Sequence, residues 1–178
     1  GLIDDRILIR QTQARFDKVL APKVAGAWNL HKATEHMPLD WFVLMSSSAS
    51  LMGSVGQSNY AAANAFLDGL AGHRRAAGLP ALSINWGAWE GEGMVSSLDD
   101  AMLRRRAELG MGRLRPAQAL EIFGRLIPNR ETAQVGVLPL NWERLAATLQ
   151  TITPFLSEVC RPDASKAGSD LLPVRQRE

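Results

Sequence analysis

An alternation of short apolar runs with an alanine-rich segment constrains the fold of this 178-residue chain more than any other feature. Trp41 to Met45 is a continuous apolar run that ends in serines, and Ala81 to Trp86 is a second run that follows a Gly-Leu-Pro stop. Between them, apolar residues recur at spacings of three and four over Gln57 to Ala77, which predicts a helix. The small residues from Ser46 to Gly56 predict a loop. Apolar strands joined through a helix are typical of a parallel sheet with a right-handed crossover.

The other segments extend this α/β pattern without completing it. Residues 10–36 predict two helices that are separated at Pro22, and further helices are expected over about 98–110 and 116–127. Gln134 to Leu140 predicts a third strand. Three strands are too few for a doubly wound sheet, and no GxGxxG opens a helix anywhere in the sequence. We therefore expect the C-terminal part of a Rossmann-like doubly wound parallel sheet without its N-terminal βαβ units, so that one sheet edge is uncovered.

The character of the sequence changes near its C-terminus. From about Pro162 the residues are polar and aperiodic, which is typical of a linker. We expect a folded catalytic portion over 1–160 and a linker over 161–178. Because the chain starts at Gly1 and its first residues already have the pattern of folded sequence, we also expect it to be an internal piece of a longer polypeptide.

Composition excludes several functional classes. The net charge is only +2 and the charges are spread out, which does not indicate nucleic-acid binding. The single Cys160 excludes an internal disulfide and a cysteine-cluster metal site, and His31, His36 and His73 lack metal-ligand spacing. The sequence has neither a signal peptide nor an apolar stretch of ~20 residues that could span a bilayer. We therefore expect a cytoplasmic location, with no metal, membrane or nucleic-acid partner.

The only tyrosine, Tyr60, has the neighbours that an acid catalyst needs. Ser47 precedes it by thirteen residues, Asn64 follows it by four, and Lys23 lies thirty-seven residues upstream. Ligands of open parallel sheets bind beyond the carboxyl ends of the strands, where Ser47 and Trp86-Gly87 are expected. A phenol with a reference pKa of about 10 could protonate a carbonyl if an ammonium and a hydroxyl assist it. The alternative is a core tyrosine and a loop serine, which residue frequencies favour.

At these residues the chain closely resembles the ketoreductase domain of modular type I polyketide synthases, a branch of the short-chain dehydrogenase/reductase superfamily. The resemblance covers about residues 1–160. It rests on PKVAGAWNLH, on FVLMSSSASLMGSVGQSNYAAANAFLDGLAGHRRAAGLPALSINWGAWEGEGM and on VLPLNW, in which Trp142 is expected at the end of the last strand. The superfamily usually has a lysine four residues after the catalytic tyrosine, where this chain has Asn64. Polyketide ketoreductases exchange these two residues, and Lys23 matches their upstream lysine.

The resemblance implies a role for each of these residues. Tyr60 would donate a proton to the β-keto oxygen, and Ser47 would hydrogen-bond the same oxygen. Lys23 would hold the ribose of NADPH and favour proton loss from the phenol, while Asn64 would position the lysine and a proton-relay water. Trp86 and Gly87 would contribute to the cofactor site, whose pyrophosphate-binding part lies outside the chain. NADPH would deliver the hydride.

The resemblance also implies a stereochemical class. Ile3-Asp4-Asp5 matches the LDD motif of B-type ketoreductases, which give a D-configured hydroxyl, although Asp5 alone would equally suit a loop or helix-capping carboxylate. Met52 stands where another class has a tryptophan, and Asn59 also fits the B type. The loop from Trp86 to Met94 would line the substrate groove, and the helix at 98–110 would cover it. The residues expected to contact substrate or control stereochemistry are Asp5, Met52, Asn59 and Met94.

Two other functions remain open at this point. A degenerate ketoreductase could serve only as a scaffold, although the intact set of four polar residues argues against degeneration. A free-standing short-chain reductase conflicts with the displaced lysine and with a C-terminal linker that resembles a tether to an acyl carrier domain. The expected partners are that carrier, bearing a phosphopantetheine-bound β-ketoacyl chain, and other polyketide synthase domains. The isolated chain is expected to bind NADPH weakly and to be inactive.

Overall fold

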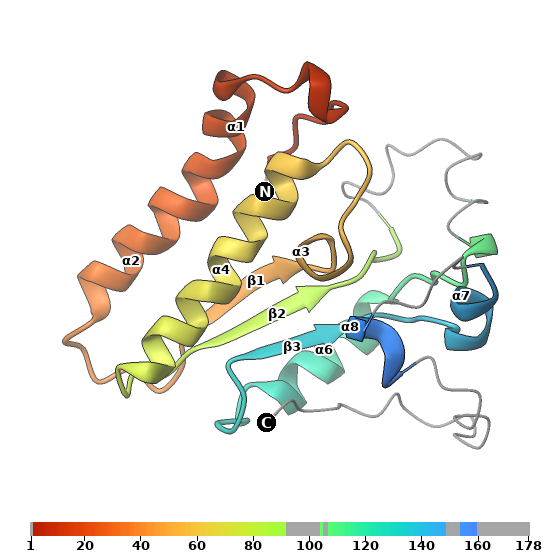
Figure 1. Ribbon diagram of the computed structural model, residues 1–178. Helices are drawn as coiled ribbons and strands as arrows, with labels where there is room; N and C mark the ends of the chain where they lie inside the picture. Colours follow the sequence, from red (N-terminus) through yellow and green to blue (C-terminus); the bar gives the residue numbers. More distant parts are fainter. Residues whose placement is uncertain (1, 92–103, 105–106, 149–153, 160–178) are drawn as a thin grey trace. The chain divides into compact units, whose positions relative to one another are not determined.

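A computed structural model describes residues 2–91, 104, 107–148 and 154–159. The chain divides into two compact units, and the described residues of the first are 2–87 and 122–137. This first unit contains a three-stranded parallel sheet with helices packed on it (Figure 1). The predicted α/β class is therefore confirmed. No helix in the described ranges has the length and apolar character of a membrane span.

The sheet has the order β1-β2-β3, in which β1 is Val43–Ser47, β2 is Leu82–Trp86 and β3 is Gln134–Val137. Every residue of the central strand β2 is buried. The first predicted strand is shifted, because the ladder continues through Ser47, which pairs with Trp86. The prediction that the loop starts at Ser46 is therefore wrong, since serine amides join a parallel ladder as readily as those of apolar residues.

One edge of β1 carries no further strand among the described residues. The amide of Leu82 donates to the Phe42 carbonyl at 2.9 Å. The amide of Ser48 donates to the Trp86 carbonyl, also at 2.9 Å. Backbone groups of alternate residues point in opposite directions along a strand, so the carbonyl of Met45 points to the edge away from β2. The expected uncovered edge is therefore present in this part of the chain.

Two helical segments cover one face of the sheet. Helix α4, Ser58–Ala76, packs on β1 and β2, and lies beside the N-terminal helices α1, Gln13–Leu20, and α2, Gly26–Thr34 (Figure 1). Buried apolar residues of α2, β1 and α4, with one residue just before β2, form a single cluster: Ala27, Leu44, Leu67, Leu70, Ala71 and Ala81. The predicted helix at 57–77 is confirmed with slightly shorter ends.

The predicted break at Pro22 is wrong. Between α1 and α2 the chain forms a π-helical segment, η2, over Ala21–Ala25, so that helical structure runs without interruption from Gln13 to Thr34. Proline removes one backbone donor and crowds the preceding turn, and the wider π turn accommodates it without ending the helix. Lys23 therefore lies in a π turn and not in the first turn of a new helix.

The loop that was predicted over Ser46 to Gly56 contains a short helix, α3, at Ala49–Met52. Gly56 has a φ of +79°, a left-handed conformation that favours glycine. Its carbonyl accepts a hydrogen bond from the amide of Arg6 at 2.8 Å. The N-terminal segment, including the 3-10 turn η1 at Leu8–Arg10, is therefore attached to the loop that precedes α4.

The second unit is described at 88–91, 104, 107–121, 138–148 and 154–159. Helix α6, Pro116–Leu126, begins in this unit, and α7, Trp142–Thr148, and α8, Pro154–Ser157, lie within it. Trp142 therefore starts a helix and does not end a strand, because the Asn141 side chain accepts the Arg144 amide at 2.9 Å as a helix cap. β3 ends at Val137, so the predicted strand to Leu140 was too long; Pro139 has no backbone donor for a ladder.

Most of the predicted helix at 98–110, part of the glycine-rich loop and all of 161–178 lie outside the described residues. The predicted domain boundary near residue 160 stays a prediction.

Candidate active site

Tyr60 lies in the first turn of α4 with only 7% of its surface exposed. Its ring belongs to an apolar cluster with Val19, Ala49 and Ala63, and Ile3 packs against the same cluster. Ala49 is two residues beyond Ser47, so this cluster joins the tyrosine helix to the turn that follows β1. The ring is thereby fixed at the carboxyl end of the sheet, where ligands of parallel sheets bind.

Lys23 reaches this end of the sheet from the π turn η2. Its Nζ donates to the carbonyl of Met45 at 3.0 Å, on the open edge of β1, and lies 5.8 Å from the centroid of the Tyr60 ring. Burial lowers the pKa of Lys23 because a low-dielectric environment disfavours its charged form, and the negative charge of Asp68 opposes that shift. The structure thus brings together a lysine and a tyrosine that are far apart in sequence.

Asn64 is fully buried one helical turn after Tyr60. Its Nδ2 donates to the carbonyl of Tyr60 at 2.7 Å. Its Oδ1 is buried and has no hydrogen-bond partner among the described residues. A buried acceptor without a donor is costly, so this oxygen is suited to a donor that is brought by a bound molecule.

Ser47 is the last residue of β1. Its Oγ accepts a hydrogen bond from the amide of Ala49 at 3.2 Å. Among the residues that the structure describes, none accepts the proton of the Ser47 hydroxyl. Trp86, its neighbour on β2, is buried, and Gly87 continues the ladder by donating to the Val137 carbonyl at 2.8 Å. The hydroxyl of Ser47 can therefore donate to a ligand, whereas Gly87 is held by the sheet.

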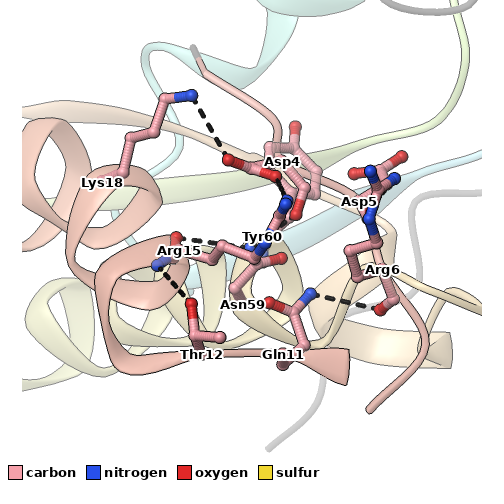
Figure 2. Close-up of polar contacts among 9 residues, drawn as sticks. All are labelled: Asp4, Asp5, Arg6, Gln11, Thr12, Arg15, Lys18, Asn59 and Tyr60. Carbon is pink, nitrogen blue, oxygen red and sulfur yellow. Dashed lines mark hydrogen bonds and ion pairs between the residues drawn. The ribbon is translucent and has the colours of Figure 1, made fainter. Parts of the chain in front are cut away.

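Asn59, on α4, connects the N-terminal segment to the helix that carries Tyr60 (Figure 2). The side chain is fully buried; its Oδ1 accepts the Tyr60 amide at 2.8 Å and its Nδ2 donates to the Asp4 carbonyl at 3.0 Å. The carboxylate of Asp4 pairs with Arg15 and, at 3.2 Å, with Lys18. The segment that resembles the LDD motif is thus attached to both α1 and α4.

The other residues expected near the substrate differ in how firmly they are held. Asp5 is exposed, and its Oδ2 accepts the Gln57 side chain at 2.9 Å, next to the start of α4. Met52 is the half-buried last residue of α3. Met94 lies outside the described residues. Asp5 and Asn59 are therefore brought to the Tyr60 end of α4.

A buried polar network beneath the site was not predicted from the sequence. The Asp68 carboxylate accepts hydrogen bonds from Ser50 at 2.7 Å and from Ser83 at 2.6 Å. The Nδ2 of Asn85 approaches both carboxylate oxygens, at 3.0 and 2.9 Å. A signal was present: Asp68 follows Asn64 by four residues on one helix face. Ser83 and Asn85 are two residues apart, so they lie on one face of a strand whose other residues are apolar.

These side chains fit the ribose end of a nicotinamide nucleotide. The Lys23 ammonium has donors beyond the one that Met45 accepts, and the Tyr60 phenol can both donate and accept. Both groups can therefore bind ribose hydroxyls at the open edge of β1.

Within the described ranges, no three histidine, cysteine, aspartate or glutamate side chains are grouped so that they could hold a metal ion.

Comparison with known proteins identifies the family. The KR domain family matches residues 1–91 of the chain. The chain belongs to this family and corresponds to the catalytic part of a ketoreductase (KR) domain of modular type I polyketide synthases. The family resemblance inferred from the sequence is thereby confirmed.

Similar proteins are large. The chain is 50% identical over 124 residues to the phenolphthiocerol synthesis polyketide synthase type I Pks15/1 of Mycobacterium bovis, covering 69% of this chain and 6% of that protein. It is 46% identical over 157 residues to the polyketide synthase GfsB of Streptomyces halstedii, covering 88% of this chain and 3% of that protein. The chain thus spans a small fraction of these multidomain polypeptides.

Solved structures show the same fold. An A-type ketoreductase from a modular polyketide synthase is similar with a TM-score of 0.80 and 35% identity, over 91% of this chain and 34% of that chain. The first ketoreductase of the tylosin polyketide synthase has a TM-score of 0.75 and 35% identity, over 95% of this chain and 37% of that one. The three strands and their helices therefore correspond to about a third of those structures, and the partial Rossmann-like fold is confirmed.

Proposed function

We propose that this chain carries the catalytic residues of an NADPH-dependent β-ketoacyl reductase that acts in polyketide biosynthesis. The observation that carries the proposal is the position of the Lys23 ammonium, 5.8 Å from the centroid of the Tyr60 ring and fixed to β1 through Met45. A half-buried ammonium that lies against a buried phenol serves acid catalysis better than it serves stability, because its burial is costly.

The side chains divide the work of carbonyl reduction. NADPH, when bound, supplies the hydride. The Tyr60 hydroxyl donates a proton to the β-keto oxygen, and Ser47 donates a hydrogen bond to that oxygen as negative charge develops on it. The Lys23 charge stabilises the phenolate that remains. The unpartnered Oδ1 of Asn64 accepts a donor in the proton path that restores the phenol.

The product hydroxyl of this proposal has the D configuration of a B-type enzyme. The support comes from residues: Asp5 and Asn59 lie at the Tyr60 end of α4, and Met52 stands where another class has a tryptophan. Overall fold does not discriminate, because similar structures include A-type and C2-type ketoreductases.

The substrate of this reaction is a β-ketoacyl thioester on the phosphopantetheine of an acyl carrier domain, and the partners are the other domains of a cytoplasmic polyketide synthase. The similarity to large polyketide synthases supports this assignment. A scaffold without activity is a second candidate, because one relative, 49% identical over 124 residues, is a putative inactive polyketide synthase of Mycobacterium tuberculosis.

The test uses the full-length polypeptide that contains this chain, a β-ketoacyl thioester and NADPH. We expect NADPH oxidation with formation of one equivalent of the D-β-hydroxyacyl thioester, measured by absorbance and chiral chromatography. An L-configured product would overturn the B-type assignment alone. No oxidation of NADPH above the rate without enzyme would favour the scaffold.

A further inference from the structure

Asp68 links the helix that carries Tyr60 to the short helix α3 and to the central strand β2. It lies eight residues after Tyr60 on α4, ~12 Å further along the helix axis. Its carboxylate accepts the hydroxyls of Ser50, in α3, and Ser83, in β2, together with the Nδ2 of Asn85. All these neighbours can donate hydrogen bonds, and an ionised carboxylate can only accept them, so the surroundings suit a charged Asp68.

The same network reaches the turn that positions Ser47. The Ser50 hydroxyl lies 2.8 Å from the Ser47 carbonyl, and the Nδ2 of Asn85 lies 2.8 Å from the Ser50 Oγ and 3.4 Å from that carbonyl. The Oδ1 of Asn85 accepts from Gln134 on β3 at 3.0 Å. The single proton of the Ser50 hydroxyl is donated either to Asp68 or to the Ser47 carbonyl. Polar contacts within hydrogen-bond distance thus connect Asp68, through Ser50 and Asn85, to the backbone of Ser47 in β1, and through Asn85 to β3.

Asp68 also affects the charge of Lys23. The described titratable groups that face Lys23 are both on α4: the carboxylate of Asp68 and the phenol of Tyr60. Burial lowers the pKa of Lys23, and Asp68 raises it. A neutral residue at position 68 would remove a negative charge that raises the pKa of Lys23.

We infer that Asp68 is a positioning residue of the reductase: through Ser50 and Asn85 it fixes the turn that carries Ser47. It does not touch the substrate. Its two effects are separable, because one depends on hydrogen bonds to Ser50 and Asn85 and the other on charge. The inference rests on the proposed function for its kinetic part only.

The test is Asp68→Asn in the full-length polypeptide, with Asp40→Asn, an exposed aspartate, as the matched control. We expect kcat to fall at least tenfold with the KM values for the thioester and NADPH within about threefold. We also expect the alkaline limb of the pH–kcat profile to move to lower pH. Asp40→Asn leaves both unchanged.

A second readout does not depend on activity. The rate at which Lys23 is acylated by an amine-reactive ester, followed by mass spectrometry against pH, reports its deprotonated fraction. We expect Asp68→Asn to move this curve to lower pH relative to wild type and to Asp40→Asn. If the wild type lacks reductase activity, the proposed function fails, and the acylation curve still tests whether Asp68 raises the pKa of Lys23.

Ser50→Ala separates the two effects and serves if Asp68→Asn does not fold. This variant keeps the charge of Asp68 but loses the link to Ser47. We expect kcat to fall about fivefold while the acylation curve of Lys23 is unchanged. An unchanged kcat in Ser50→Ala, or an unchanged kcat in folded Asp68→Asn, would overturn the inference.

Discussion

The Nζ of Lys23 lies 5.8 Å from the centroid of the Tyr60 ring, although thirty-seven residues separate the two in sequence. Two local features produce this relationship. The π turn at Ala21–Ala25 continues the helix through Pro22, and the carbonyl of Met45 on the open edge of β1 holds the ammonium. In this chain the lysine on the tyrosine helix is replaced by Asn64, and the fold supplies the charge from another element.

Lys23→Met should abolish most of the activity. The substitution keeps the length and apolar contacts of the side chain but removes the ammonium that stabilises the Tyr60 phenolate. We expect kcat/KM for the β-ketoacyl thioester to fall about 100-fold or more in the full-length polypeptide. Lys32→Met, which changes an exposed lysine on α2, is the control and should retain wild-type kinetics.

The resemblance to polyketide ketoreductases predicted that Lys23, Tyr60 and Asn64 share one site. The structure places the Lys23 ammonium 5.8 Å from the centroid of the Tyr60 ring and Asn64 one helical turn further along α4, and the catalytic roles of these residues stay a prediction. The path of the chain that brings them together was not predictable from periodicity. A proline within a helical pattern usually marks an end, and the periodicity gives no sign that a π turn carries the helix through Pro22.

The network around Asp68 was missed for a different reason. Ser83 and Asn85 lie in a strand of mainly apolar residues, and a buried strand pattern gives no information on which polar side chain finds a partner. Helices and strands can be predicted because their patterns repeat within a short stretch of sequence. This network instead connects residues up to 49 positions apart, such as Asn85 and Gln134.

The stability of the chain should decrease as the pH falls below about 6.5. His31 is buried, and its Nδ1 lies 3.1 Å from a guanidinium nitrogen of Arg74, which can only donate. Burial lowers the pKa of His31, and the charge of Arg74 lowers it further, against the opposing effect of Glu35. The unfolded chain therefore binds a proton that the native chain does not, and native stability is lost towards acid pH.

Urea unfolding of the chain at pH 5.5 and 7.5 measures this effect. The wild type should have the smaller free energy of unfolding at the acid pH, and His31→Gln should show less than half of that difference. His36→Gln is the control, because the His36 side chain is 91% exposed. An equal pH dependence in His31→Gln and the wild type would refute this account.

Asp4 and Asp5 are adjacent but should behave differently on substitution. Asp4 pairs with Arg15 and Lys18 and has only 18% of its side chain exposed. We expect Asp4→Asn to reduce the free energy of unfolding by about 1 kcal/mol, the upper range for a partly exposed ion pair.

Asp5→Asn should leave stability within about 0.5 kcal/mol, since Asp5 is exposed, but should change the configuration of the product. Chiral chromatography of the β-hydroxyacyl thioester made by the full-length polypeptide measures the D:L ratio, with Asp17→Asn, an exposed residue on α1, as the control. We expect the L product to rise at least tenfold in Asp5→Asn. A ratio equal to that of the control would remove Asp5 from stereochemical control.

The central claim is that Tyr60 protonates the carbonyl oxygen, and Tyr60→Phe tests it most directly. Phenylalanine keeps the ring contacts with Val19, Ala49 and Ala63 and removes only the hydroxyl. In the full-length polypeptide we expect kcat for β-ketoacyl reduction to fall at least 100-fold, with NADPH affinity within about fivefold of the wild type. A kcat within twofold of the wild type would contradict the account.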